Sequence, residues 1–138
     1  MPKLIVAAII VGEGDKILAS ARAYPADLAG RFEFAGGKVE DGEDPRDALV
    51  RELDEELHLA VSLGPAFRNP HNADGTWPLD GGRKMATWWA RPLTHTTPLL
   101  TSSHLAHVWQ PRERLSELNW LAPDRPIATL LERTTPPL

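Results

Sequence analysis

The chain has 138 residues, the size of one domain, and 15 basic against 19 acidic residues give a formal net charge of −4. This balance argues against a protein that coats a nucleic-acid polymer, although it allows a small phosphorylated ligand. The absence of cysteine excludes disulfides and thiolate metal sites. The longest apolar run, residues 4–11, is far shorter than the ~20 residues of a membrane span. We therefore expect a single domain over residues 1–138, soluble and cytoplasmic, with no membrane partner.

The first half of the chain begins with strand patterns. The run LIVAAIIV at residues 4–11 is short, continuous and rich in β-branched residues, which is typical of a fully buried strand. GEGD then predicts a turn, and KILASAR at residues 16–22 is expected to be the hairpin partner of the first strand. RFEF at residues 31–34 alternates polar and apolar residues like a short strand, and it runs directly into Gly36 and Gly37.

A helix is expected next. Pro45 suits a first helical turn with Asp44 or Glu43 as the cap, and strong helix formers continue to about Leu57. The remaining patterns predict strands at 60–68, 84–93 and 105–109, a Gly- and Pro-rich loop at 69–82, and helices at 111–118 and 125–133. Strands mixed with a few helices in one small domain predict a layered α/β or α+β fold.

Two stripes run along the predicted helix. The apolar stripe, expected to face the core, comprises Leu49, Val50, Leu53 and Leu57. The second stripe, about 120° around the helix from the first, carries Glu52, Glu55 and Glu56. Three carboxylates so close together destabilise an isolated helix, and a hard divalent cation such as Mg²⁺ or Mn²⁺ reverses that effect. The alternative is a solvated acidic face, with Arg46 and Arg51 pairing locally to the acids.

The spacing of this segment favours the first interpretation. GGKVEDGEDPRDALVRELDEELHL, residues 36–59, resembles the Nudix box G-x5-E-x7-R-E-U-x-E-E-x-G-U, where U is a bulky apolar residue. The fixed positions that match are Gly37, Glu43, Arg51, Glu52, Glu55 and Glu56. At ~7% usage per residue type, such a match arises by chance about once in ten million starting positions. One position departs: His58 replaces the second Gly, where a left-handed turn is expected, and we expect a small loss of stability there.

The resemblance to the Nudix hydrolase family implies a fold, an activity and a cofactor. The fold would be the α/β Nudix fold, a mixed β-sheet packed between α-helices as an α/β/α sandwich. Members hydrolyse a nucleoside diphosphate linked to another group, with Mg²⁺, or alternatively Mn²⁺, held against the diphosphate. By position, the metal ligands would be Glu52, Glu55, Glu56 and the carbonyl of Gly36. Arg51 would orient the carboxylates, Glu43 would hold Arg51 or the loop, and Gly37 would let the backbone approach the ligand.

The flanking sequence resembles the MutT-like branch, which acts on nucleoside triphosphates. In SARAYPADLAGRFEFAGGKV, residues 20–39, the resemblance implies a phosphate contact for Arg22, with Lys38 in a similar role. Phe34 would lie near the base or line its pocket. The alternatives are an ordinary exposed strand arginine for Arg22 and plain core packing for Phe34.

The segment WLAPDRPIATLLE, residues 120–132, also resembles this branch. Members that act on oxidised guanine carry an Asn near the start of the last helix, and Asp124 stands at that position here. An ionised Asp only accepts hydrogen bonds, which suits an exocyclic amino group such as N4 of cytosine. The stretch also resembles members that act on CTP, dCTP and 5-substituted cytosine nucleotides. The alternative is that Asp124 merely caps the helix whose first turn holds Pro126.

The general base is left open by the sequence. Related enzymes often supply a further Glu ahead of the strand at 105–109, and Ser103 stands about there. The candidates are Glu52, Glu55, the loop acids Asp74 and Asp80, and, more weakly, His104.

The resemblance implies a nucleoside triphosphate pyrophosphohydrolase that releases the monophosphate and pyrophosphate. The expected substrates are cytosine nucleotides (CTP, dCTP, 5-methyl-dCTP), oxidised nucleotides such as 8-oxo-dGTP, or both, in nucleotide pool sanitation and DNA repair. Alternatives are an ADP-ribose-type hydrolase and a Nudix protein that senses a nucleotide without hydrolysing it. The only expected partner is a small nucleotide, and the oligomeric state is open between monomer and dimer.

Overall fold

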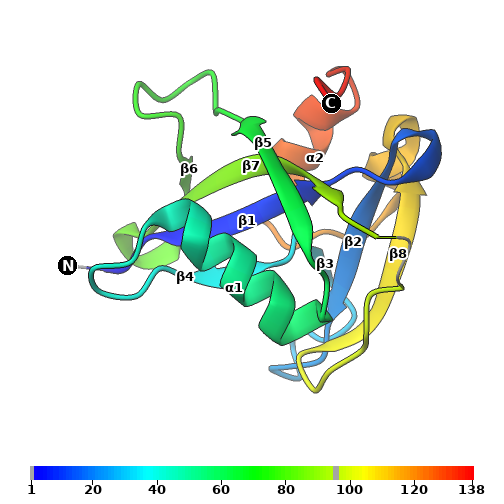
Figure 1. The fold of residues 1–138 in the computed structure, drawn as a ribbon, viewed down its shortest axis with the longest axis horizontal. Helices are drawn as coiled ribbons and strands as arrows, with labels where there is room; N and C mark the ends of the chain where they lie inside the picture. The colour runs from blue at the N-terminus through cyan, green and yellow to red at the C-terminus, as the bar shows by residue number, and fades with distance from the viewer. Residues whose placement is uncertain (1, 95–96) are drawn as a thin grey trace.

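The computed structural model describes residues 2–94 and 97–138, and its strands form two sheets (Figure 1). The larger sheet is mixed and has the order β4 (Gly36–Lys38), β1 (Ile5–Ile10), β7 (Lys84–Pro92), β5 (Val61–Ala66), with β6 (Trp77–Pro78) also pairing with β7. The smaller sheet is antiparallel and has the order β3 (Phe32–Glu33), β2 (Lys16–Arg22), β8 (His104–Pro111). The α-helices are α1 (Pro45–Leu57) and α2 (Arg125–Leu131), and none of the helices in the described ranges is long and apolar enough to cross a membrane.

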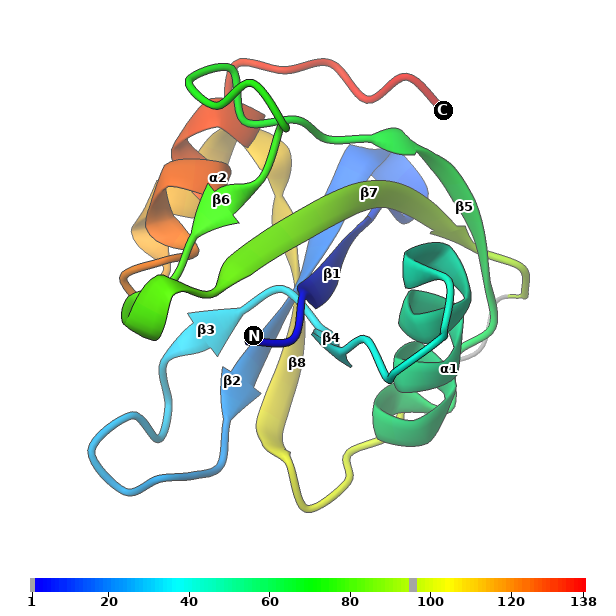
Figure 2. The ribbon, with the colours of Figure 1, turned by 90° about the vertical axis from the view of Figure 1, so that its left-hand side faces the viewer.

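Strand β1 is buried on both faces, and its alternation divides the core in two. Val6, Ala8 and Ile10 pack with the buried face of α1. The intervening residues Ala7, Ile9 and Val11 pack on the opposite side with a cluster that includes buried residues of α2. Figure 2 shows α1 and α2 on opposite sides of β1 and β7. The expected mixed sheet between α-helices is therefore confirmed, with a second, smaller sheet added to it.

The predicted hairpin between the first two strands is wrong. Strands β1 and β2 share only an isolated bridge between Val11 and Ile17, and β2 pairs instead with β3 and β8. The physical reason is that both edges of β1 are already occupied, by β4 in antiparallel and β7 in parallel orientation. The chain must therefore leave the first sheet after the turn and begin the second.

Helix α1 begins as predicted. Its N-cap is Asp44, whose Oδ1 accepts hydrogen bonds from the backbone N–H groups of Arg46 at 2.8 Å and Asp47 at 3.3 Å. At the other end, His58 adopts the left-handed conformation with φ 50° and ψ 42°. The expectation that His58 takes over the conformation of the motif glycine is confirmed.

The buried face of α1 differs from the prediction at one position. Leu49, Leu53 and Leu57 are fully buried, but Val50 is 39% exposed and Ala48 is buried in its place. The packed face is therefore rotated toward the Ala48 side of the helix. This rotation leaves Glu52 and Glu56 half-buried beside the core instead of on a separate solvent-facing stripe.

The other predicted elements are present with small changes at their ends. The strands expected at 60–68, 84–93 and 105–109 are β5, β7 and β8, and the last expected helix is α2. The segment expected as a helix at 111–118 is a 3-10 helix, η3 (Arg112–Glu117), and the loop expected at 69–82 contains the short strand β6 and the 3-10 turn η2 (Asp80–Gly82).

Candidate active site

Two glycines of β4 bring the backbone against its neighbours where no side chain fits. A Cβ on Gly36 would collide with the backbone carbonyl of Val6 in β1, and a Cβ on Gly37 would collide with the carboxyl group of Glu52. The pairing of β4 with β1 therefore requires the first glycine. The second lets the Glu52 carboxylate lie directly against the strand, because a side chain at this position would displace that carboxylate.

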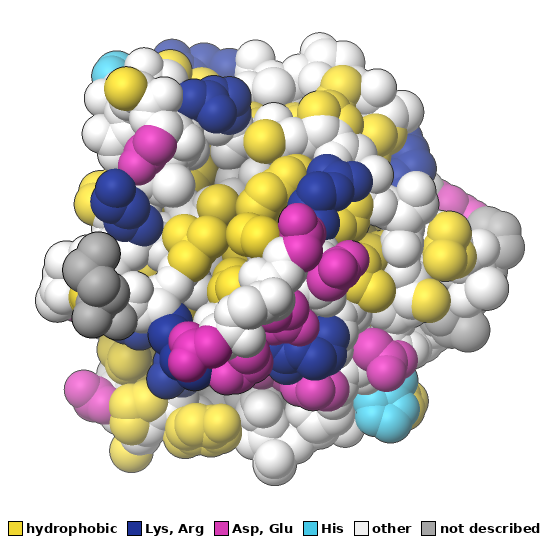
Figure 3. Space-filling model, turned by 60° about the vertical axis from the view of Figure 1, so that its left-hand side comes forward, with side chains coloured by type: hydrophobic (Ala, Val, Ile, Leu, Met, Phe, Trp, Pro, Cys, Tyr) yellow, Lys and Arg dark blue, Asp and Glu magenta, His cyan; other side chains and the backbone are white. Residues whose placement is uncertain are grey.

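Arg51 is the centre of the ion pairs around this strand. Its Nε and Nη2 donate to both oxygens of Glu43 at 2.8 and 2.9 Å, a bidentate pair. Nη1 donates to Glu52 at 3.1 Å and to Glu55 at 3.2 Å, and Nη2 also donates to the carbonyl of Lys38 at 3.1 Å. One guanidinium thus ties the loop, β4 and two helix carboxylates together. The face drawn in Figure 3 carries a dense group of acidic side chains interspersed with Lys and Arg.

The carboxylates of this group differ in their electrostatic environment. The Arg51 hydrogen bonds lower the pKa of Glu43 to about 2, and Glu43 in turn raises the pKa of Arg51. Burial raises the pKa of Glu52, against the opposing effect of Arg51. Burial also raises the pKa of Glu56 to about 7, with Glu52 and Glu33 adding to the rise. Glu43 is thus a structural anion, whereas Glu52 and Glu56 gain from any added positive charge.

The donor set on α1 fits a hard divalent cation. The described residues contain no ready-made cluster of three metal-binding side chains, because Arg51 draws Glu52 and Glu55 toward itself. Mg²⁺, however, usually keeps several waters and takes one or two carboxylates plus substrate phosphates. Glu55 is exposed and Glu56 makes no ion pair among the described residues, so oxygen ligands are available without an all-protein cage.

The residues expected at the substrate end surround β3. Arg22, at the end of β2, donates through Nε to the carbonyl of Tyr24 at 3.0 Å and pairs with Glu33 at 3.5 Å. Lys38 is exposed. Phe34 is only 3% exposed and stacks on Trp120, with 4.5 Å between ring centroids, so it lies in the core cluster.

Asp124 is buried beside β3. Residues 119–121 run along this strand through backbone hydrogen bonds to both sides of Phe32, which brings Asp124 against the backbone of Phe34. Burial, helped by the charge of Glu33, raises the pKa of Asp124 to about 8. The side chain makes no capping hydrogen bond to α2, so among the described residues the simple helix-cap interpretation is wrong.

Glu33 is the site residue that sequence reasoning missed. Its carboxylate bonds His104 Nε2 at 2.8 Å and Arg22 Nη1 at 3.5 Å. Its charge acts on both Glu56 and Asp124, so it lies between the acids of α1 and the buried Asp124. The sequence signal that could have identified Glu33 is its place beside Phe34, just ahead of Gly36 and Gly37.

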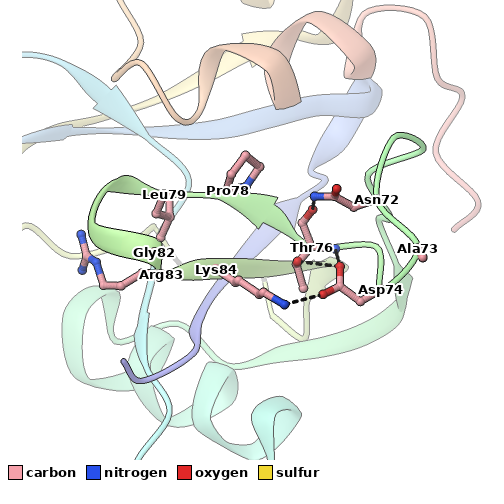
Figure 4. Close-up of a pocket in the computed structure, with 9 residues that line it drawn as sticks. All are labelled: Asn72, Ala73, Asp74, Thr76, Pro78, Leu79, Gly82, Arg83 and Lys84. Atoms are coloured by element: carbon pink, nitrogen blue, oxygen red, sulfur yellow. Dashed lines mark hydrogen bonds and ion pairs between the residues drawn. The ribbon is translucent and has the colours of Figure 1, made fainter. Parts of the chain in front are cut away.

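The candidate bases outside α1 lie in different settings. Asp74 accepts from Lys84 at 2.9 Å and from Thr76, interactions that lower its pKa, and it lines a cavity of about 400 Å³ beside β6 (Figure 4). Asp80 is exposed in the turn η2. Ser103 donates its backbone N–H to Thr101. No described contact joins these three to α1.

Comparison with known proteins gives concordant matches. The family model of the NUDIX domain matches residues 1–131. The CTP pyrophosphohydrolase of Escherichia coli (strain K12) is 42% identical over 112 residues, which cover 80% of this chain and 78% of the relative. Putative 8-oxo-dGTP diphosphatase 2 of Mycobacterium tuberculosis is 34% identical over 135 residues, covering 96% and 89%. The solution structure of the E. coli ORF135 protein has a TM-score of 0.73 at 34% identity and covers 98% of this chain and 93% of that one.

Proposed function

This chain belongs to the NUDIX domain family, and from that premise we propose that it is a Mg²⁺-dependent nucleoside triphosphate pyrophosphohydrolase. It would convert the triphosphate to the monophosphate and pyrophosphate, with cytosine nucleotides such as CTP, dCTP and 5-methyl-dCTP as the leading substrates. Its place would be among free cytoplasmic nucleotides, in sanitation of the nucleotide pool. The names of the relatives, a CTP pyrophosphohydrolase and a putative 8-oxo-dGTP diphosphatase, support this substrate class.

One observation carries the proposal: Arg51 gathers Glu43, Glu52 and Glu55 beside a strand of two glycines. Surface ion pairs contribute little to stability, so four charges held against a strand where a side chain at Gly37 would displace the Glu52 carboxylate indicate a role in binding. We assign Glu52 and Glu55 as the catalytic carboxylates. Arg51 orients them, and its bidentate pair with Glu43 keeps that orientation.

The metal would be held by Glu52, Glu55, Glu56 and the carbonyl of Gly36. When bound, a divalent cation neutralises phosphate charge and lowers the pKa of a coordinated water. The protein's own contribution is to hold carboxylates that burial leaves short of positive charge, as the raised pKa values of Glu52 and Glu56 indicate. Gly37 lets the backbone approach the phosphates, and Arg22 and Lys38 supply further positive charge toward them.

Asp124 can pair with cytosine in a way that the sequence did not anticipate. A carboxyl group with a pKa of about 8 is mostly protonated at pH 7, so it offers one donor and one acceptor instead of acceptors alone. Cytosine presents an amino donor at N4 beside an acceptor at N3, which this pattern fits, and guanine presents an N1–H donor beside the O6 acceptor, which it fits as well. Ionised Asp124 would instead suit the two neighbouring N–H donors of guanine. Phe34 would shape this end of the site from the core side, through its stack on Trp120.

Oxidised guanine nucleotides are the second candidate substrate, favoured by the name of the M. tuberculosis relative. Hydrolysis of ADP-ribose ranks lower, because the matched ADP-ribose pyrophosphatase structure is only 22% identical and supports the fold alone. A sensor without catalysis also ranks lower, since every carboxylate of the box is present: Glu43, Glu52, Glu55 and Glu56.

The test is pyrophosphate release from CTP, dCTP, 5-methyl-dCTP, dGTP, 8-oxo-dGTP and ADP-ribose, each with Mg²⁺ and with EDTA. We expect pyrophosphate from the triphosphates with Mg²⁺ only, released fastest from cytosine nucleotides. Fastest release from 8-oxo-dGTP would support the proposed reaction and show that oxidised guanine nucleotides, not cytosine nucleotides, are the preferred substrates. Nucleotide binding without turnover of any substrate would show that the protein is a nucleotide sensor and not an enzyme.

A further inference from the structure

A β-bulge in β8, with Leu105 as the extra residue, changes which residues of β2 and β8 lie opposite each other. Before the bulge, Ala21 lies opposite Ala106, and a regular ladder would next place Arg22 opposite Leu105. The register shifts between Ala21 and Arg22, so Arg22 lies opposite His104 instead. Bulges commonly re-aim a side chain next to an active site. Here the result is that a cation of the substrate end and a buried histidine become cross-strand neighbours.

His104 and Arg22 both contact the same carboxylate. The His104 side chain is 1% exposed, and its Nε2 lies 2.8 Å from Glu33 Oε2. Because a carboxylate only accepts, Nε2 carries the proton and donates it. The other oxygen of Glu33 lies 3.5 Å from Arg22 Nη1. His104 therefore fixes one oxygen of Glu33, and this places the other oxygen beside Arg22.

One ring nitrogen of His104 has no structural partner in the described part of the chain. Its Nδ1 is buried and has no hydrogen-bond partner among the described residues, although buried polar atoms are nearly always satisfied. Its neighbour His107, with 5.2 Å between the ring centroids, shows the ordinary arrangement. Nε2 of His107 donates to the carbonyl of Leu99 and Nδ1 accepts from Ser20, so both nitrogens are used. His104 uses only the nitrogen that faces Glu33.

We propose that His104 is a positioning residue that holds Glu33, and through Glu33 the guanidinium of Arg22, in the arrangement that receives the nucleotide. His104 itself does not touch the substrate in this account. Glu33 acts on both Glu56 and Asp124, so its orientation matters at both ends of the site. The inference rests on the proposed function, because it assigns His104 a role in binding the nucleotide of that reaction.

The experiment compares His104→Leu, His104→Gln and Glu33→Gln with wild type on dCTP. Leu removes the hydrogen bond, whereas the Gln amide can still donate from nearly the position of Nε2. We expect His104→Leu to raise KM about tenfold, as loss of a charge-assisted hydrogen bond in the bound state allows, with kcat within about twofold. His104→Gln should recover most of this loss. In the Glu33→Gln background, His104→Leu should have little further effect, because the partner through which it acts is altered.

His107→Gln is the matched control, since His107 lies on the same strand but does not contact Glu33; its KM should stay near the wild-type value. Affinity for a non-hydrolysable dCTP analogue, measured on every variant, separates the two proposals. If wild type binds the analogue but releases no pyrophosphate from dCTP, the proposed function is contradicted. The role of His104 is then still tested by the Kd values of the variants. Wild-type KM and Kd in His104→Leu, or effects of His104→Leu and Glu33→Gln that simply multiply, would overturn the positioning role. So would a rise in KM in His107→Gln as large as the rise in His104→Leu.

Discussion

Two carboxyl groups that stand at the starts of the two α-helices meet opposite environments. Glu43, just before α1, receives two hydrogen bonds from Arg51, which lower its pKa to about 2. Asp124, just before α2, is buried without an ion pair among the described residues, and its pKa rises to about 8. The first group is an anion in an exposed network of charges, and the second is a neutral acid in the core.

The difference separates two tasks. Around Arg51 the charges are concentrated and kept ionised, which suits binding of a cation and of phosphates. Around Asp124 the site is desolvated, and a single hydrogen-bond pattern can discriminate strongly because an unpaired buried group is unfavourable. We therefore attribute the reaction to the charged residues around Arg51, called the α1 end, and the recognition of the base to the surroundings of Asp124, called the α2 end. The following substitutions test this division, from the largest expected effect to the smallest.

Glu55→Gln should break the α1 end most completely. It removes a metal-binding charge from an exposed side chain, so we expect turnover to fall at least ~10³-fold while the unfolding midpoint changes little. The control is Asp54→Asn, an exposed carboxylate on the same helix that we do not assign to the metal. Steady-state rates and thermal unfolding of both variants make the comparison. Wild-type turnover in Glu55→Gln would contradict the metal-site assignment.

Arg51→Lys should weaken the same end without removing an acid. A lysine cannot reproduce the fork that holds Glu43, Glu52 and Glu55 together, so we expect about a 100-fold lower kcat/KM for all triphosphates and a slightly lower unfolding midpoint. Arg46→Lys, on the same helix, serves as the control, because among the described residues the Arg46 guanidinium donates only to the carbonyls of Leu63 and Gly64. A loss that differs strongly between bases would contradict the division of tasks.

Asp124→Asn should test the α2 end through the pH dependence of the free energy of unfolding. Because the pKa of Asp124 in the folded state, about 8, exceeds its ordinary value of 3.8, its stabilising contribution is complete below about pH 4. That contribution is lost as the pH rises through about 8. Asn removes this loss, so above about pH 8 the variant should exceed wild type in unfolding free energy by a few kcal/mol, on the order that linkage allows. Parallel pH slopes in urea unfolding of the two proteins would show that Asp124 is not buried as a neutral acid.

His58→Gly should have the smallest effect and leave both ends intact. Histidine at φ 50° occupies a conformation that favours glycine, so the variant should gain about 1 kcal/mol of stability. Because His58 belongs neither to the charged residues around Arg51 nor to the surroundings of Asp124, kcat/KM should stay within about twofold of wild type. Lower stability in the glycine variant would mean that the imidazole itself contributes to the helix end.

The α1 end was readable from the sequence because its chemistry is local. Asp44, the carboxylates, Arg51 and the glycines lie within one short segment, and helix periodicity together with the box spacing fixes their relation. Two details depended on tertiary packing instead. The packed face of α1 is rotated toward Ala48, which leaves Val50 exposed, and β1 lacks a free edge for the predicted hairpin.

The α2 end was less predictable because it joins segments that are distant along the chain. Position alone identified Asp124, but its charge state depends on burial against β3 and on Glu33. Glu33 and His104 are joined across 71 residues, and a bulge in β8 determines that His104 lies opposite Arg22. No local pattern announces these contacts, so the sequence suggested an ionised Asp124 and left Glu33 out.

The division of tasks is tested most directly by the ratio of kcat/KM for dCTP to that for dGTP, measured from about pH 6.5 to about pH 9, on either side of the raised pKa of Asp124. The ratio cancels effects that both substrates share. We predict that it falls with rising pH in wild type as Asp124 ionises, stays flat in Asp124→Asn, and follows wild type in Arg51→Lys. A ratio that is independent of pH in wild type, or one that Arg51→Lys changes as much as Asp124→Asn, would contradict the account.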